Sequence, residues 1–155
     1  LPVRAEEAKY VALTFDDGPS GIYALKLLDG LYDRGVQATF LLCGYRMKDY
    51  PDLTKRIWEE GHEIGYHGFT HKNMQQMSRR EIAKELEDSQ ALLPEGCSPV
   101  FLRPPGGCCS DAVRQVAEVI FPSLEQSEMV TKCWVSTVAV EKPTIPAIWK
   151  AFAPP

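Results

Sequence analysis

The sequence predicts an α/β fold built on a parallel sheet. Short apolar segments rich in strand-forming residues alternate four times with segments whose apolar residues recur at helical spacing, and turn signals separate them. Such alternation is typical of parallel strands joined by helical crossovers. In folds of this kind the functional site lies at the carboxyl ends of the strands. Three clusters of unusual residues follow predicted strands, as that rule requires: Asp16-Asp17, residues 67–71 and residues 103–107.

The first predicted strand covers residues 9–15 (KYVALTF), an apolar run that ends at the turn signal DDGPS of residues 16–20. The apolar residues that follow recur three and four positions apart and predict a first helix that ends before Gly35. The residues of this predicted apolar face are Ile22, Leu25, Leu28, Leu31 and Tyr32.

The second predicted strand covers residues 38–43 (ATFLLC), a continuous apolar run that is too short for an independent helix. Pro51 is expected to be the first residue of the next helix, because proline is favoured there, and Gly61 is expected to end it. Its apolar face consists of Leu53, Ile57 and Trp58. Residues 62–66 (HEIGY) predict the third strand.

A capping box, Ser78-Arg79-Arg80-Glu81, predicts a helix that starts at about residue 79 and carries Ile82, Leu86 and Leu93. Residues 100–103 (VFLR) predict a fourth strand, which ends at the Pro-Pro-Gly-Gly turn of residues 104–107. Ser110 is then expected to cap a helix that carries Val113, Val116 and Ala117. Beyond Phe121 we expect one further strand, at residues 134–140.

Length and composition indicate one globular domain, residues 1–155, with 45% hydrophobic and 25% charged residues. The net charge of −4 lacks the broad basic footprint of nucleic-acid binding, so no nucleic-acid partner is expected. No apolar run approaches the ~20 residues that span a bilayer, so no transmembrane segment is expected. The first residue is Leu1, and no apolar signal segment follows it; we expect any export signal to have been removed.

The five cysteines are an odd number without Cys-x-x-Cys spacing, which argues against a zinc ribbon and against a disulfide framework. At least one thiol is therefore expected to be unpaired or intermolecular. The cysteines are Cys43, Cys97, Cys108, Cys109 and Cys133.

Two of the unusual clusters contain metal-ligand residue types. Asp16 and Asp17 are adjacent, so that one carboxylate could bind a metal while the other handles a proton; the alternative is an ordinary acidic turn. His67 and His71 are four apart, and on a helical turn both could meet one ion; the alternative is two surface histidines. The third histidine, His62, lies in a predicted strand and is expected to be structural.

The third cluster is Arg103 followed by the Pro-Pro-Gly-Gly turn. A guanidinium at a strand end can hold a carboxylate, and glycine amides in a stiff turn are open to a ligand. The alternative is a surface salt bridge beside a tight turn.

Together, TFDDGPS (residues 14–20), HGFTH (67–71) and RPPGG (103–107) closely resemble the polysaccharide deacetylase family, also called the NodB-homology domain or carbohydrate esterase family 4. QATFLLCG (37–44) and the residues before His67 resemble it too, so the similarity covers about residues 9–118. The resemblance implies an irregular (β/α) barrel of seven or eight strands. Since residues 119–155 diverge, we expect a barrel that is incomplete at its C-terminal end, or that another chain completes in a dimer.

The resemblance also implies roles for individual residues. Asp17, His67 and His71 would bind a divalent metal, usually zinc and alternatively cobalt, and Asp16 would be the general base. Arg103 would orient Asp16, while Pro104 and the amide of Gly106 would face the substrate and its oxyanion. The implied function is metal-dependent removal of N-acetyl groups from an N-acetylglucosamine polysaccharide, either peptidoglycan or a chitin-like polymer, outside the cell or at its surface.

The chain departs from this family in its last quarter. The family normally adds an aspartate-tryptophan motif and a late Leu-x-His motif whose histidine is the general acid, yet here no Asp follows Asp111 and no His follows His71. Trp134 could match the late strand, with Glu141 as at best a substitute acid. We therefore expect impaired turnover.

Two alternatives to a deacetylase stay open at this point. The first is an inactive relative of the deacetylases that only binds metal and glycan. The second, more remote, is a receiver-like signalling domain that binds magnesium through its acidic pair, although such a domain needs neither the clustered histidines nor RPPGG.

Overall fold

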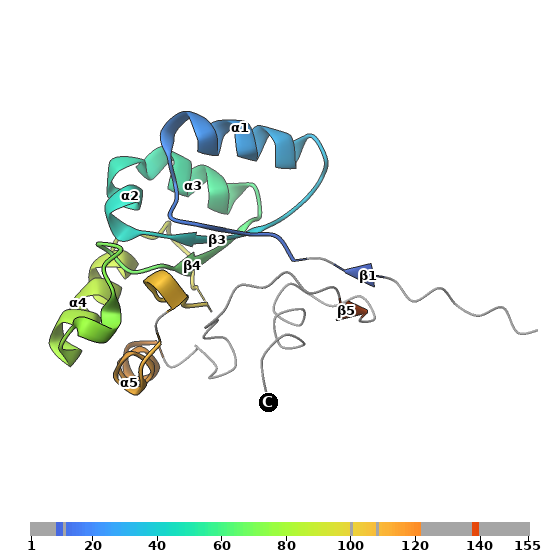
Figure 1. Cartoon of the computed structure of the whole chain (residues 1–155). Helices are drawn as coiled ribbons and strands as arrows, with labels where there is room; N and C mark the ends of the chain where they lie inside the picture. Colours follow the sequence, from blue (N-terminus) through green and yellow to red (C-terminus); the bar gives the residue numbers. More distant parts are fainter. Residues whose placement is uncertain (1–8, 11, 100, 108, 122–137, 140–155) are drawn as a thin grey trace, which may run out of the picture.

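The computed structural model of the chain describes residues 9–10, 12–99, 101–107, 109–121 and 138–139 (Figure 1). The elements in chain order are β1 (Lys9–Tyr10), β2 (Thr14–Asp16), α1 (Gly21–Tyr32), β3 (Thr39–Leu42), α2 (Gly44–Asp49), α3 (Pro51–Glu59), β4 (Glu63–Tyr66), η1 (Met74–Gln76), α4 (Arg79–Gln90), η2 (Pro105–Gly107), α5 (Asp111–Ile120) and β5 (Val138–Ala139).

A parallel sheet forms the centre of the fold, in the order β2-β3-β4. Phe40 of β3 lies opposite Phe15 on one side and Ile64 on the other. All four residues of β3 are buried, which explains why this strand is a continuous apolar run rather than an alternating one. A single parallel bridge between Tyr66 and Leu102 extends the sheet beyond β4. The predicted parallel α/β architecture is confirmed.

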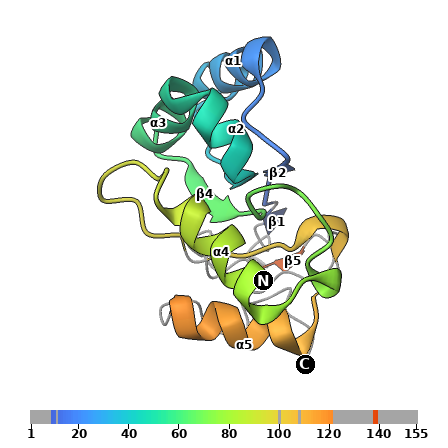
Figure 2. The same cartoon turned by 90° about the vertical axis from the view of Figure 1, so that its left-hand side faces the viewer.

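The helices follow one another around the strands, and Figure 2 shows α1, α3, α4 and α5 in this succession from top to bottom. One core cluster joins α1 and α3 to the sheet around Leu28, Phe40 and Ile57. A second joins α4 and α5 to the end of β4 around Tyr66 and Leu86. Each helix therefore buries its apolar stripe against the next part of the sheet, as parallel strands with helical crossovers require.

Three helix starts agree with the sequence signals. Pro51 is the first residue of α3. Ser78 and Glu81 form the predicted capping box at the start of α4, each side chain bonding the backbone of the other residue. The Ser110 side chain accepts a hydrogen bond from the Val113 amide at the start of α5. These local signals hold because they depend on only four neighbouring residues.

The strand predictions at 9–15 and 100–103 were wrong in extent. Residues 9–15 do not form one strand: β1 pairs antiparallel with β5, whereas β2 belongs to the parallel sheet. At 101–103 only Leu102 forms a bridge. The Tyr66 amide donates to the carbonyl oxygen of Phe101, and the Arg103 amide donates to the carbonyl oxygen of Tyr66. The run stops there because Pro104 has no amide hydrogen to continue a ladder.

Of the strand expected at 134–140, only 138–139 is described; Trp134 lies outside the described residues, as does Glu141.

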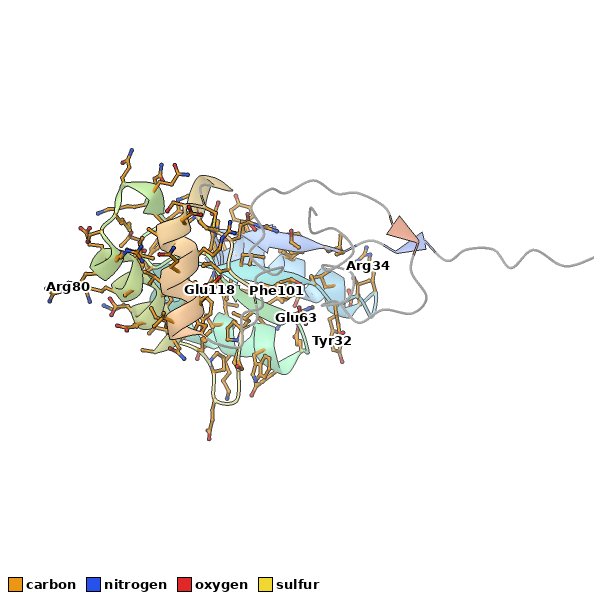
Figure 3. All side chains as sticks on the ribbon, turned by 90° about the horizontal axis from the view of Figure 1, so that it is seen from below. Tyr32, Arg34, Glu63, Arg80, Phe101 and Glu118 are labelled. Carbon is orange, nitrogen blue, oxygen red and sulfur yellow. The ribbon has the colours of Figure 1, made fainter. Side chains whose placement is uncertain are left out.

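The apolar face of the first helix differs from the predicted one. Its buried residues are Ala24, Leu28 and Leu31, whereas Ile22 is 68% exposed and Tyr32 is 72% exposed. Figure 3 shows the Tyr32 side chain at the edge of the molecule, far from Arg80 of α4. Leu28 and Leu31 of the predicted face are thus buried, and Ala24 completes the buried stripe.

The short helix α2 was not predicted, although Gly44 and Met47 in it are buried. It begins directly after β3 and brings its first amides to the carboxyl edge of the sheet. Asp16 ends β2, His67 follows β4, and Arg103 follows the bridge at Leu102. Three sequence clusters therefore meet at one edge. In the part of the chain that is described, no helix is long and apolar enough to cross a membrane.

Candidate metal centre and active site

Three side chains meet at this edge with atoms suited to a metal ion. The Oδ1 atom of Asp17 lies 3.1 Å from Nε2 of His67 and 2.9 Å from Nε2 of His71. All three ligand atoms lie within 4.8 Å of one another. His67 is almost fully buried, whereas His71 and Asp17 are partly open to solvent, so the group has a closed side and an accessible side.

The tautomer of His67 follows from its other ring nitrogen. Nδ1 lies 2.6 Å from the carbonyl oxygen of Arg103, and a carbonyl oxygen can only accept a hydrogen bond. Nδ1 therefore carries the proton and donates it, and in the neutral ring the Nε2 lone pair points toward Asp17. A histidine that donates its second N–H to a backbone carbonyl is the usual arrangement in metal sites.

The donor set fits a zinc-like ion. Two imidazoles and one carboxylate are a common catalytic zinc set, and their ligand atoms lie about 2.0–2.2 Å from the ion. In a tetrahedral site of this size, neighbouring ligand atoms lie roughly 3.3 Å from one another. The two distances from Asp17 are close to this separation. The three residues would leave a fourth position open on the exposed side, where water or a substrate could enter.

Two of the three residues have unusual backbone conformations. Among the described residues, Asp17 (φ 68°) and His71 (φ 61°) are the non-glycine residues with positive φ. Such conformations cost about 1–3 kcal/mol each and persist where the surroundings impose them, often at functional sites. The four-residue spacing of His67 and His71 was interpreted as a helical turn, but His71 lies in a loop. The curved loop of residues 68–70 brings the two rings together instead, with their centroids 5.1 Å apart.

Asp16 and Arg103 form an ion pair beside this group. The Nη1 atom of Arg103 contacts Oδ1 of Asp16 and also lies 3.4 Å from the hydroxyl of Thr14. Only 4% of Arg103 is exposed, whereas the Asp16 carboxylate is about one third exposed. The buried guanidinium therefore fixes one oxygen of Asp16, which leaves Oδ2 to accept a proton at the surface.

The turn after Arg103 lies on the same edge. Pro104 is buried, and its carbonyl oxygen accepts a hydrogen bond from the amide of Gly107. Gly106 is exposed and has a φ of 68°, a conformation that glycine adopts without steric cost. The turn thus brings peptide groups to the surface beside the Asp16–Arg103 pair.

Cys43 lies directly behind His67, and its Sγ atom is 3.7 Å from the His67 carbonyl oxygen. Burial, and after it the nearby carboxylate of Asp17, raises the pKa of this thiol to about 12. It is therefore a neutral S–H group at physiological pH, which packs against the site and does not provide a nucleophile.

His62 has a separate, structural role, as expected. It is 3% exposed, and its Nδ1 atom accepts a hydrogen bond from the amide of Ala38 at 3.2 Å. Burial lowers its pKa, and the effects of the nearby Glu60 and Arg56 charges are smaller. His62 stabilises the sheet at the end opposite to the metal-ligand group.

Sequence reasoning missed Glu85 of α4, which contacts the loop between the two histidines. Its carboxylate accepts hydrogen bonds from the amides of Phe69 and Thr70 and from the Thr70 hydroxyl. The signal was present in the sequence, because Glu85 lies at helical spacing from Ile82 and Ser89 on the buried stripe of the helix. A charged residue at such a position indicates a polar partner.

The family model described as polysaccharide deacetylase matches residues 4–120, three quarters of the chain. This chain belongs to the polysaccharide deacetylase family. Among curated proteins, a peptidoglycan-N-acetylglucosamine deacetylase from Bacillus cereus is 40% identical over 99 residues, which cover 63% of this chain and 36% of that protein. A peptidoglycan-N-acetylmuramic acid deacetylase from Bacillus subtilis is 36% identical over 108 residues, 68% of this chain and 23% of that protein.

Solved structures of the family share the fold of this deacetylase-family chain. A family 4 carbohydrate esterase from Streptomyces lividans, in complex with acetate, matches with a TM-score of 0.67 at 32% identity, over 72% of this chain and 58% of that one. The α/β barrel class of the family is therefore the fold class of this chain, and the sheet β2-β3-β4 with the bridge at Leu102 is part of such a barrel.

A pseudoenzyme of carbohydrate esterase family 4 from Bacillus anthracis also matches, with a TM-score of 0.64 at 28% identity, over 70% of this chain and 40% of that one. A mutant of it with restored activity is 31% identical over the same shares. Across these comparisons, the chain spans about a quarter to a third of the two curated relatives and about half of the two solved structures.

Proposed function

We propose that this chain is a metal-dependent hydrolase that removes N-acetyl groups from an N-acetylglucosamine-containing polysaccharide. The observation that carries the proposal is the convergence of Asp17, His67 and His71 on one point beside the Asp16–Arg103 pair. The carboxyl edge of the sheet thus holds both a metal-ligand set and a surface carboxylate suited to proton transfer. Hydrolysis of an acetamide with water needs both.

Each residue has one role in this proposal. The divalent ion, zinc or alternatively cobalt, supplies positive charge that polarises the acetyl carbonyl and makes water more acidic. Asp16 accepts the proton of the attacking water on Oδ2 while Arg103 holds its Oδ1. We assign Pro104 and Gly106 to the substrate side, and the Gly106 amide to the oxyanion that develops on the acetyl group.

The substrate class rests on the relatives. The Bacillus cereus relative is named for N-acetylglucosamine of peptidoglycan and the Bacillus subtilis relative for N-acetylmuramic acid. Both sugars carry the acetamide that the proposed chemistry cleaves. We therefore propose peptidoglycan as the polymer that this chain acts on, with a chitin-like polymer as the alternative, and a place of action at the cell surface.

The second candidate function is an inactive relative that binds glycan and metal. The Bacillus anthracis relative is described as a pseudoenzyme of the same family. This chain has both the metal-ligand group and the Asp16–Arg103 pair that hydrolysis needs, so hydrolysis is the function that we propose first.

The test is acetate release from an N-acetylglucosamine oligomer, with the metal removed by a chelator and then restored with zinc or cobalt. We expect slow release that stops on chelation and returns with the metal, and no release by His67→Ala. Binding of the oligomer without any metal-dependent acetate release would instead support the binding protein.

A further inference from the structure

Residues 68–70 join the two histidines of the metal-ligand group without forming any regular secondary structure. A loop of this kind has no ladder of its own to satisfy its peptide groups, so its shape depends on partners from elsewhere in the fold. The positions of the His67 and His71 rings depend on that shape, because the loop is the connection between them. What holds this loop therefore determines the geometry of the candidate metal centre.

One side of the loop is held by the start of α2. The amide of Gly44 donates to the carbonyl oxygen of Gly68 at 2.9 Å, and the amide of Tyr45 donates to that of Phe69 at 3.0 Å. The ring of Phe69 packs against Gly44, where a Cβ atom would collide with it. The carbonyl groups of the loop are thus fixed by a helix that follows β3 directly.

The other side is held by one carboxylate of α4. Oε2 of Glu85 accepts from the amides of Phe69 and Thr70 at 2.7 and 2.8 Å, and Oε1 accepts from the Thr70 hydroxyl at 2.7 Å. Glu85 is 8% exposed. Three hydrogen bonds of this kind satisfy a buried carboxylate, which would otherwise carry a large desolvation cost. The φ of +77° favours glycine at position 68, where a Cβ atom would lie 2.9 Å from Cε of Met74 and 3.3 Å from Oε2 of Glu85.

We propose that Glu85 is the positioning residue of the metal centre. By fixing the amides of Phe69 and Thr70, it sets the separation and orientation of His67 and His71, and so the affinity for the ion. This inference rests on the proposed function, because it requires that the two histidines bind a metal. It extends that function to a residue that lies on a helix, outside the three clusters that the sequence marks.

The test compares three variants of the full chain. Glu85→Leu removes all three acceptors, while Glu85→Gln keeps an oxygen for the two amides and places its NH₂ group against the Thr70 hydroxyl, which can accept. Glu87→Leu is the matched control, because Glu87 is exposed on the same helix. The probe is Co²⁺ alone, titrated into metal-free protein and followed by its visible absorption, so that no substrate or turnover is needed.

We expect Co²⁺ to bind about 10-fold more weakly to Glu85→Leu, the lower end of the range for loss of a group bonded directly to a metal ligand, because Glu85 acts on the histidines only through the loop. Binding by Glu85→Gln and Glu87→Leu should stay close to wild type. In the metal-free protein, the amide protons of Phe69 and Thr70 should exchange with solvent faster in Glu85→Leu. If this variant does not fold, Thr70→Val, which removes one of the three bonds, should weaken Co²⁺ binding by a smaller factor.

Three results would overturn the inference. Equal Co²⁺ affinity in wild type and Glu85→Leu, or in Thr70→Val if that variant is needed, would show that the loop keeps its geometry without the carboxylate. Equal losses in Glu85→Gln and Glu85→Leu would show that the negative charge matters and the hydrogen bonds do not. A wild-type chain that binds no Co²⁺ would overturn the proposed function together with this inference, whereas the first two results leave the proposed function intact.

Discussion

His67 and Arg103 are joined by a hydrogen bond of 2.6 Å between Nδ1 of the histidine and the carbonyl oxygen of the arginine. The same arginine contacts Asp16 through its side chain. One residue therefore fixes the tautomer of a candidate metal ligand with its backbone and the orientation of the candidate base with its guanidinium. The ligand set and the base cannot shift independently, because Arg103 connects them.

The first prediction concerns metal content. Purified chain should hold about one divalent ion, and His67→Ala should lose it, since two remaining ligands bind zinc much more weakly than three. Elemental analysis of the metal per chain measures this. His62→Gln is the control: it replaces a buried histidine that lies outside the ligand group, so it should retain the ion. An unchanged metal content in His67→Ala would remove His67 from the site.

The second prediction separates the two adjacent aspartates. Asp16→Asn should lower turnover by about 10²- to 10⁴-fold, the usual contribution of a general base, with little change in metal affinity. Asp17→Asn should lose the metal, because Oδ1 of Asp17 lies between the two imidazoles. Turnover and metal content are measured on the same samples. If Asp16→Asn loses the metal as completely as Asp17→Asn, the two roles must be exchanged.

The sequence predicted those parts of this molecule that depend on near neighbours. The capping box at Ser78, the first residue of α3 at Pro51 and the buried run of β3 are set by four to six consecutive residues. The extent of the strand at 100–103 was not predictable in this way, because Leu102 forms one bridge to Tyr66 from a distant part of the chain. Long-range contacts of this kind leave little trace in a local pattern.

The same distinction applies to the site. The three clusters that contain Asp17, His67 and Arg103 were visible because rare residue types follow predicted strands, and parallel topology brings strand ends together. Glu85 was missed because its partners are backbone amides 15 and 16 residues away. The backbone conformation of His71 was missed as well, since its four-residue spacing from His67 fits a helical turn equally well.

The third prediction follows from the lowered pKa of His62. Burial disfavours the charged imidazole in the folded state, so the unfolded chain takes up a proton at a higher pH than the folded one. The neutral imidazole of His62 therefore contributes fully to the free energy of unfolding above the ordinary histidine pKa of about 6.5. This contribution is lost as the pH falls toward the lowered pKa of the folded state. Acidification should therefore destabilise the wild type more than it destabilises His62→Gln.

Urea unfolding of the metal-free protein at about pH 7.5 and 5.5 measures this difference. The two proteins differ only at residue 62, so the effects of all other groups cancel when the two are compared. Gln can still accept the hydrogen bond of the Ala38 amide through its side-chain oxygen, which makes it the suitable replacement. An identical loss of stability in both proteins would contradict the prediction.

The fourth prediction concerns the helix that carries Glu85. Ser78→Ala removes the side chain that caps α4, where Oγ accepts from the Glu81 amide, and should destabilise the fold by about 1 kcal/mol. Chemical denaturation measures the change in the free energy of unfolding. Ser78→Asp retains a capping oxygen and should restore most of the loss. If Ser78→Ala and wild type unfold at the same denaturant concentration, the cap contributes nothing to stability.

The last prediction concerns the leaving group. Cleavage of an acetamide expels an amine that must gain a proton, and no histidine follows His71 in this chain to supply one. Loss of a general acid typically lowers the rate by about 10²- to 10⁴-fold. An activated aryl acetate needs no such acid, because its phenolate leaves without a proton. The 155-residue chain, loaded with zinc or cobalt, should therefore hydrolyse an aryl acetate readily and an N-acetylglucosamine oligomer slowly.

Asp16→Asn should lower the rate on both substrates, because both need attack by water, and this variant shows that the aryl acetate is cleaved at the same site. A version of the chain extended with the family's late aspartate and histidine should gain rate on the oligomer alone. Equal gains on both substrates would show that the extension acts by completing the barrel around the site and not by protonating the amine. Rapid cleavage of the oligomer by the unextended chain would show that water or another residue of this chain supplies the proton.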